Sequence, residues 1–180
     1  MYCGSRTPHQ SIFSQSADQL GKEIAKRSWD VVFGGGKIGM MGRVADAALS
    51  QNGQVIGVIP TALKLEEIAH TGLSELIETQ NMHTRKAKME ELSHAFVVLP
   101  GGFGTLDEFF EILTWRQLGF HNKPIILVDI DGYFSGLKQF IQRAIDEDYV
   151  RKSNLKLFHW VSTVEESMTY LDEYFQINTD

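Results

Sequence analysis

The sequence has 180 residues, of which 43% are hydrophobic and 22% are charged, and a formal net charge of −6. These values describe an acidic globular chain with the length of one ordinary domain, and they exclude a disordered chain or a polycation. Nucleic-acid binding is therefore disfavoured. The single cysteine, Cys3, excludes an intrachain disulfide, and the sequence shows no long apolar segment or secretory leader. We expect a cytoplasmic protein without membrane contact.

Apolar runs alternate with helical patterns along the chain. The opening MYCGS is short for a central strand. Four longer runs are typical of strands buried on both faces: DVVFG (30–34), QVIGVIP (54–60), HAFVVLP (94–100) and KPIILVD (123–129). A further short strand is expected near residues 155–161. The alternation predicts an α/β fold with a doubly wound parallel sheet, Rossmann-like, in one nucleotide-binding domain over residues 1–180.

The helices between these strands are predicted from apolar stripes. Ala17, Leu20 and Ile24 form one stripe, and Phe110, Leu113 and Leu118 are expected to form another. Residues 133–148 and 163–175 are predicted to be two more helices. Left-handed caps are expected at two places where a helical pattern stops, Asn52-Gly53 and Gly119.

The first glycine loop, GGGKIGMMG, follows the strand DVVF, and Gly34, Gly36 and Gly39 satisfy G-x-G-x-x-G. A dinucleotide site also needs an acidic residue at the end of the next strand, but that strand ends in Pro60-Thr61. A P-loop would need a closing G-K-[ST], which is missing. Two alternatives stay open: backbone amides that bind a mononucleotide or sugar phosphate, and a tight turn that packs a helix on a strand.

The segment MHTRKAKMEEL, residues 82–92, predicts a basic helix. Met82, Arg85 and Met89 share one face, where a guanidinium could bind phosphate, carboxylate or ribose oxygens in a bidentate manner. The other charged residues are expected to pair along a solvated face: Lys86, Lys88, Glu90 and Glu91.

The second glycine loop, PGGFGTLDE, covers residues 100–108 and follows the apolar run AFVVL. Such a loop at a strand-to-helix junction lets backbone N–H groups approach an anion. Thr105 and Glu108 have the T-x-x-E spacing of a capping box, so Glu108 is equally a helix cap and a candidate catalytic carboxylate. The six histidines lack metal-ligand spacing, and we predict no metal site.

Four motifs occur here in a characteristic order: GGGKIGMMG, MHTRKAKM, PGGFGTLDE and TWRQLGFHNKP. In these motifs, and over nearly the whole chain, the sequence resembles the LOG family, the cytokinin riboside 5'-monophosphate phosphoribohydrolases long labelled lysine decarboxylases. The resemblance implies a Rossmann-like fold, a homodimer and no cofactor. It also implies hydrolysis of the N-glycosidic bond of a nucleoside 5'-monophosphate, which yields free base and ribose 5-phosphate.

The resemblance also implies which residues form the site. Arg85 and Glu108 are the expected catalytic residues. The expected substrate- and phosphate-binding residues are Gly34, Gly35, Gly36, Gly101, Gly102, Gly104, Thr105, Met82, Lys86 and Ser5. In the implied mechanism Glu108 stabilises an oxocarbenium-like transition state and orients water, while Arg85 holds substrate oxygens. Arginine is too basic to protonate the leaving base, and Asp107 is one candidate for that role. The sequence departs from the family at Arg6, where a second serine is usual.

Other functions predict different behaviour. A non-catalytic nucleotide-binding module would bind AMP without releasing base. A lysine decarboxylase would need a pyridoxal phosphate lysine, for which we find no surrounding motif. A DNA-processing relative is disfavoured by the net charge. If the protein is a homodimer, the helix over residues 106–118 is the expected part of its interface.

Overall fold

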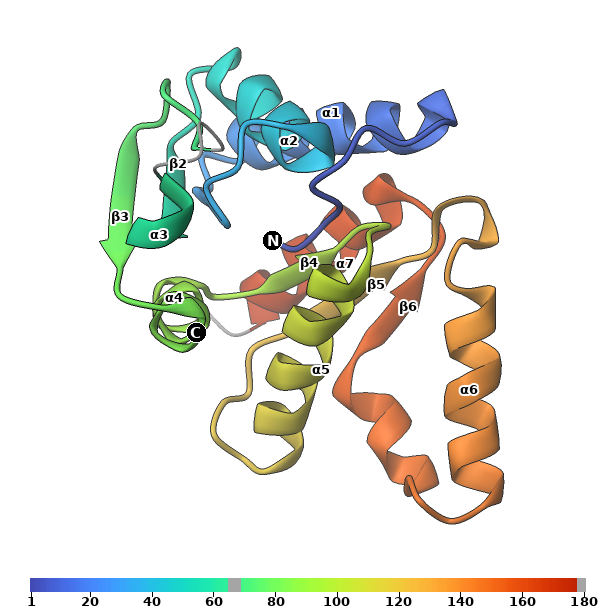
Figure 1. The fold of residues 1–180 in the computed structure, drawn as a ribbon. Helices are drawn as coiled ribbons and strands as arrows, with labels where there is room; N and C mark the ends of the chain where they lie inside the picture. The colour runs from blue at the N-terminus through green and yellow to red at the C-terminus, as the bar shows by residue number, and fades with distance from the viewer. Residues whose placement is uncertain (65–68, 178–180) are drawn as a thin grey trace.

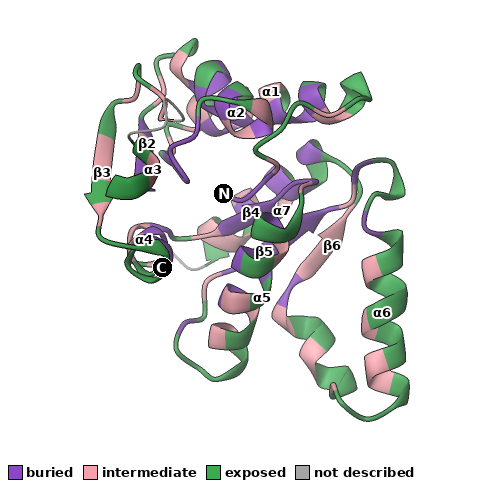
Figure 2. Cartoon of the chain, viewed as in Figure 1, coloured by how far each residue is buried: buried purple, intermediate pink, exposed green. Residues whose placement is uncertain are grey.

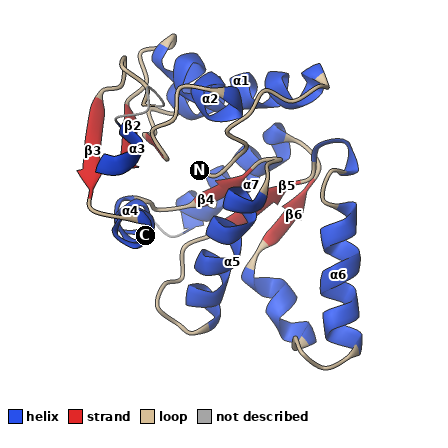
Figure 3. Ribbon diagram, in the orientation of Figure 1, coloured by secondary structure: helices blue, strands red, loops and turns tan. Residues whose placement is uncertain are grey.

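Parallel strands form two groups in the computed structural model, which describes residues 1–64 and 69–177. The first sheet has the order β1-β2-β3 and the second the order β4-β5-β6 (Figures 1 and 3). The strands are β1 (Val31–Phe33), β2 (Val55–Pro60), β3 (Glu75–Thr79), β4 (Phe96–Val98), β5 (Ile125–Val128) and β6 (His159–Val161). The predicted α/β fold with a doubly wound parallel sheet is confirmed.

Residues 1–4 lie between the two sheets and join them (Figure 1). The Met1 amino group donates to the Val32 carbonyl at 2.6 Å on β1, and the Tyr2 N–H donates to the Val97 carbonyl at 2.9 Å on β4. Tyr2 also pairs in parallel with Val98. The order of chain segments is therefore β3-β2-β1, residues 1–4, β4-β5-β6, so this short segment occupies the centre of the sheet.

Helices cover both faces of the strands. The first core is formed with α1 (Ser11–Lys26), α2 (Gly39–Leu49) and α7 (Val164–Ile177), and the second with α4 (Met82–Leu92) and α5 (Phe103–Gln117). The shorter or peripheral elements are α3 (Thr61–Lys64), η1 (Ile130–Gly132), α6 (Ser135–Asp146) and η2 (Lys152–Leu157). None of the helices in the described parts of the chain has the length and apolar character needed to cross a membrane.

Strand residues alternate between the two cores. Phe33 and Ile126 belong to the first core, whereas Val32 and Leu127, their neighbours in sequence, belong to the second. This follows from the two-residue period of a strand. All residues of β1, β4 and β5 are buried, as expected for strands covered by helices on both sides (Figure 2). The left-handed caps are also confirmed, since Asn52 has φ 60° and Gly119 has φ 81°.

Two strand predictions need correction. Strand β3 was not predicted, because ELIET is polar and half exposed at the edge of the sheet and so lacks an apolar run. The strand expected near residues 155–161 is limited to His159–Val161, and the chain before it forms the 3₁₀ helix Lys152–Leu157.

The apolar stripe predicted for α5 is confirmed for Leu113, which packs against the second core, and is wrong for Phe110 and Leu118. Phe110 and Leu118 are exposed, with 36% and 60% of their surfaces accessible, while Phe109 and Ile112 are buried. Glu108 and Thr105 share the buried face. The helix therefore turns a partly polar face inward and leaves large apolar side chains outside, because its inner face carries the site described next.

Candidate functional site

A cavity of about 920 Å³ lies at the carboxyl edge of the strands, between the two halves of the sheet. Residues that follow the strands line it, including Gly4, Pro100 and Asp131. Four helices, α1, α2, α4 and α5, begin at this cavity, because residues of their first turns are among its lining. Helix N-termini carry partial positive charge and free N–H groups, so the position favours an anionic ligand.

A buried ion pair, Arg85 of α4 with Glu108 of α5, borders the cavity. The Arg85 Nη2 atom lies 2.9 Å from Glu108 Oε1, and both side chains are only 10% exposed. Desolvation raises the pKa of Glu108, and the Arg85 guanidinium offsets part of that rise. The carboxylate is thus a stronger base than an exposed glutamate, within contact of a fixed cation.

The Arg85 guanidinium keeps hydrogen-bond donors available. Its Nη1 atom has only a weak contact with Met82 Sδ at 3.5 Å, and its Nε atom has no hydrogen-bond partner in the described residues. Buried donors without partners are rare, so this group is suited to bind ligand oxygens.

Gly34 of the first glycine loop leaves room for this guanidinium. A Cβ atom at Gly34 would lie 2.0 Å from Arg85 Nη2. A glycine is therefore needed at position 34, because the Arg85 guanidinium lies against the backbone there. The first glycine loop thus packs against the arginine of the ion pair.

The second glycine loop forms the start of α5. The N-cap is Gly102, without a side-chain hydrogen bond, so the predicted Thr105–Glu108 capping box is wrong. Thr105 is buried close to Gly101, whereas a Cβ atom at Gly102 or Gly104 would meet only open space. Backbone N–H groups at this helix start are thus accessible from the cavity.

A true capping box fixes the start of α4. The Thr84 N–H donates to Asn81 Oδ1 at 3.0 Å, and the Asn81 N–H donates to Thr84 Oγ1 at 3.2 Å. It lies just before Arg85 in the chain and anchors the turn that carries the guanidinium.

The structure brings most of the expected site residues together. Those that line the cavity are Ser5, Met82, Arg85, Gly101, Gly102, Gly104, Thr105 and Glu108. Those that do not line it are Gly34, Gly35, Gly36 and Lys86.

Lys86 departs from the expected solvated face. Its side chain is only 10% exposed, and its ammonium lies 3.1 Å from Asp107 and 3.0 Å from Glu111, both on α5. Lys88 does behave as predicted, since it is more exposed and pairs with Glu91 at 2.7 Å. The prediction failed for Lys86 because the pattern within α4 carries no information about a partner helix.

Sequence reasoning missed several residues of the lining, among them Arg6, His9, Asp131 and Tyr133. The Tyr133 hydroxyl donates to the Gly101 carbonyl at 2.8 Å and so supports the second glycine loop. Their positions in the sequence could have identified them, because Asp131 and Tyr133 closely follow a predicted strand and Arg6 follows MYCGS. Residues after parallel strands collect at one edge of the sheet.

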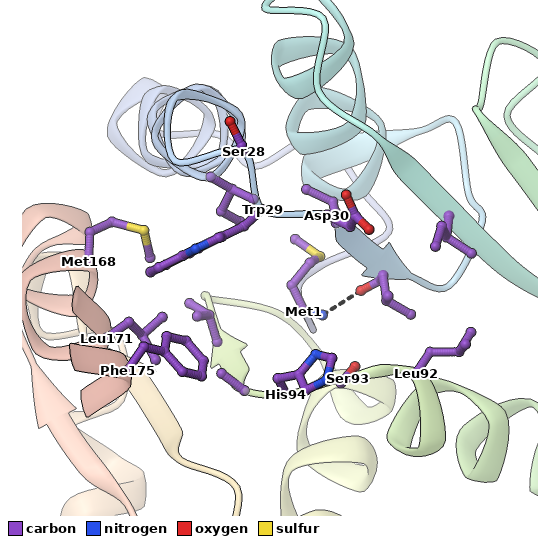
Figure 4. Close-up of a pocket in the computed structure, with 16 residues that line it drawn as sticks. Met1, Ser28, Trp29, Asp30, Leu92, Ser93, His94, Met168, Leu171 and Phe175 are labelled. Carbon is purple, nitrogen blue, oxygen red and sulfur yellow. Dashed lines mark hydrogen bonds between the residues drawn. The ribbon is translucent and has the colours of Figure 1, made fainter. Parts of the chain in front are cut away.

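A second cavity, of about 450 Å³, lies at the opposite, amino edge of the strands. Figure 4 shows Trp29, Met168, Leu171 and Phe175 gathered on one side of it and His94 on the other. Trp29 and Phe175 are in edge-to-face contact, with ring centroids 5.3 Å apart. This cavity is lined mainly by apolar side chains, and the described residues that line it form no counterpart of the ion pair.

Comparison with known proteins places the chain in a family. Residues 41–171 match the family model described as "Possible lysine decarboxylase". The chain is 41% identical over 174 residues to the probable cytokinin riboside 5'-monophosphate phosphoribohydrolase LOGL2 of Oryza sativa subsp. japonica, which covers 97% of this chain and 71% of the relative. The chain belongs to the LOG family. It is also 39% identical to cytokinin riboside 5'-monophosphate phosphoribohydrolase LOG3 of Arabidopsis thaliana, over 97% of this chain and 81% of the relative.

Solved structures share the fold of this LOG-family chain at lower identity. The molybdenum cofactor binding protein of Rippkaea orientalis superposes with a TM-score of 0.74 at 20% identity, covering 96% of this chain and 94% of the other. The Moco carrier protein of Chlamydomonas reinhardtii has a TM-score of 0.71 at 21% identity, covering 95% and 92%. At these identities the likeness concerns the fold alone.

Proposed function

We propose that this protein is a phosphoribohydrolase that cleaves the N-glycosidic bond of a cytokinin riboside 5'-monophosphate, of AMP, or of both. The observation that carries the proposal is the buried Arg85–Glu108 pair beside a cavity of nucleotide size at the carboxyl edge of the sheet. The names of the LOG-family relatives support the substrate class. Residues 1–180 act as one nucleotide-binding unit in this proposal, because both halves of the sheet contribute to the cavity.

In the proposed reaction, water attacks the anomeric carbon of the ribose as the bond to the base nitrogen breaks. The products are ribose 5-phosphate and the free base, which leaves with a proton. Positive charge develops on the sugar in the transition state. At about 4 Å and an effective dielectric near 20, the Glu108 carboxylate would stabilise that charge by roughly 4 kcal/mol, which corresponds to about three decades of rate.

Glu108 is suited to a second task, to accept a proton from the attacking water. A general base works best when its pKa lies near the working pH, and the raised pKa of Glu108 moves it in that direction. Arg85 is suited to hold substrate oxygens through donors that the protein leaves unused.

The substrate phosphate would rest at the second glycine loop. The start of α5 offers free N–H groups there, and Gly102 and Gly104 have open space in front of them. A helix N-terminus stabilises an anion by up to ~2 kcal/mol in a partly buried geometry, so a nucleoside without phosphate should react poorly.

The decisive experiment measures base release from AMP and from N6-prenylated AMP, by wild type and Glu108→Gln, with folding checked by thermal melting. Release by wild type but not by a folded variant supports the phosphoribohydrolase. No release from either nucleotide, with AMP still raising the melting temperature, would instead support a nucleotide-binding module. Equal turnover of adenosine and AMP would contradict the phosphate site.

We also propose that the protein is a homodimer through α5 and the loop after it. The exposed apolar residues there are Phe103, Phe110, Leu118 and Phe120, with Phe103 95% and Phe120 73% accessible. Clusters of exposed apolar side chains mark interaction surfaces. Sedimentation should show a dimer that Leu118→Glu with Phe120→Glu dissociates, and a wild-type monomer at micromolar concentration would contradict the proposal.

A further inference from the structure

Lys86 stands next to Arg85 in sequence but is not among the residues that line the cavity. Its ammonium has three carboxylate oxygens within 3.3 Å: both oxygens of Asp107, at 3.1 and 3.3 Å, and Glu111 Oε1 at 3.0 Å. An ammonium has three N–H donors. Two protein carboxylates therefore already balance the charge of Lys86, which favours a contact within the protein over one with a substrate phosphate.

Arg85 and Lys86 together connect α4 to α5 at two points. Arg85 bonds to Glu108, and Lys86 bonds to Asp107, the residue before Glu108, and to Glu111 one turn later. Successive residues on a helix point about 100° apart, so the two connections leave α4 in different directions. A second connection in a different direction restricts movement of α5 against α4 more than the Arg85–Glu108 pair does alone.

The burial of Lys86 distinguishes this contact from an ordinary surface ion pair. Its side chain is 10% exposed, compared with 33% for Lys88 on the same helix. Surface pairs contribute little, but a buried ammonium must keep its partners because an unpaired buried charge is strongly unfavourable. The contact therefore holds the two helices in one relative position.

We propose that Lys86 is a positioning residue for the LOG reaction: it braces α4 against α5 so that the Glu108 carboxylate is oriented toward the sugar, and it does not bind substrate. This inference rests on the proposed function of the Arg85–Glu108 pair. It replaces the substrate-binding role expected for Lys86 from the family resemblance.

The brace has an electrostatic consequence for Glu108. Desolvation raises the pKa of Glu108 most, Asp107 raises it further, and Arg85 and Lys86 lower it. The charged and titratable groups around Glu108 are Arg85 and Lys86 on α4, Asp107 and Glu111 on α5, and the Met1 amino group, Tyr2 and Cys3 on the N-terminal segment. Without the Lys86 ammonium, the Asp107 and Glu111 carboxylates lose their counter-charge, and Glu108 should hold its proton to a higher pH.

The test compares Lys86→Met and Lys86→Arg with Lys88→Met, a matched control on the same helix, in base release from AMP as a function of pH. We expect Lys86→Met to lower kcat by about ten- to a hundredfold, with KM within about twofold of wild type. The acidic limb of its kcat profile should move to higher pH. Lys86→Arg should recover most of both properties, and Lys88→Met should match wild type.

A double variant and an NMR titration test the same role of Lys86 independently. If Lys86→Met folds poorly, Lys86→Met with Glu111→Gln removes one uncompensated carboxylate and should return the acidic limb toward the wild-type pH. Glutamate-specific ¹³C NMR then follows the Glu108 titration without any reaction. If wild type releases no base, the proposed function fails, and the NMR titration of Glu108 in Lys86→Met against Lys88→Met still tests the brace.

Three results would overturn the inference. A KM raised tenfold or more, with the acidic limb unmoved, would make Lys86 a substrate-binding residue. Unchanged kcat, KM and pH profile in a folded Lys86→Met would reduce the contact to a simple ion pair. An identical Glu108 titration in Lys86→Met and Lys88→Met would disprove the electrostatic link.

Discussion

Two cavities of this protein lie at opposite edges of the same sheet and differ in what surrounds them. Four helices begin at the carboxyl edge, and the two glycine loops lie there. The Arg85–Glu108 pair is buried beside the cavity at this edge. At the amino edge, residues from the C-terminal turns of α1, α4 and α7 line the cavity, and its other walls are mostly apolar (Figure 4).

The difference shows why a cavity alone does not indicate a nucleotide site. The C-terminal ends of helices carry partial negative charge and present carbonyl groups, so the amino edge disfavours a phosphate. The carboxyl edge has the reverse polarity and also holds a cation with unused donors. We therefore expect changes at the carboxyl edge to alter activity, and changes at the amino edge to alter stability alone.

The largest expected effect is the loss of the Glu108 charge. Glu108→Gln should lower kcat for base release by about a thousandfold, since the transition-state charge loses about 4 kcal/mol of stabilisation. Steady-state assays with AMP measure it. Glu91→Gln is the control, because Glu91 is an exposed carboxylate that pairs with Lys88. A folded Glu108→Gln with wild-type kcat would contradict the catalytic role.

The next effect is smaller and acts through the first glycine loop. Gly34→Ala places a methyl group where Arg85 Nη2 now lies, so the flexible end of the arginine must move. Displacement by about 1 Å should reduce kcat/KM by roughly a hundredfold with little change in melting temperature. Gly136→Ala, at a helix position with open space, is the matched control. Equal activities for the two variants would show that the arginine position is not critical.

At the amino edge, truncation of a side chain should lower the stability of the protein without changing its activity. Trp29→Ala removes the contact with Phe175 and should lower the free energy of unfolding by about 2 kcal/mol, less than the ~3–5 kcal/mol of a fully buried aromatic. Urea unfolding measures the loss. Assays well below the melting temperature should give wild-type kcat and KM, and a reduced kcat there would mean that the two edges are coupled.

The smallest expected effect is a pH dependence of stability that originates at Glu108. Its pKa is raised in the folded state, so the native protein binds more protons than the unfolded chain. This contribution to stability is complete below the unfolded pKa of about 4.3 and is lost as pH rises through the higher folded value. Activity should rise over the same interval, because the reaction needs the ionised carboxylate.

Urea unfolding across pH 4 to 8 tests whether stability falls over the pH interval in which activity rises. Glu108→Gln should flatten the decline in stability, whereas Glu91→Gln should keep it. Parallel curves for wild type and Glu108→Gln would assign the decline to other groups.

The sequence predicts the parts of the fold that follow from local pattern. Buried strands such as β4 and β5 consist of apolar runs, and Asn52 and Gly119 lie where a left-handed cap is needed. The edge strand β3 escapes prediction because its polar residues are half exposed. Its pairing with β2 is a long-range contact that no local window contains.

The residues of the candidate site can be proposed from the sequence, but their partners cannot. Arg85 and Glu108 are singled out by motif, yet the T-x-x-E spacing suggests a cap, and only the packing of α4 on α5 pairs Glu108 with Arg85. For the same reason Lys86 was expected on a solvated face. A one-dimensional pattern tells which side chains share a helix face, and not which other helix that face meets.

The central place of residues 1–4 constrains how the protein folds during synthesis. Tyr2 leaves the ribosome before its partner Val98, which follows only after β1, β2 and β3 have been made. The two sheets cannot join until then, so the contact between residues 2 and 98 closes a long loop. The Arg85–Glu108 pair is completed still later, when α5 emerges. Assembly of the proposed catalytic edge is thus a late step, and nascent chains that end before Glu108 cannot bind nucleotide in the proposed way.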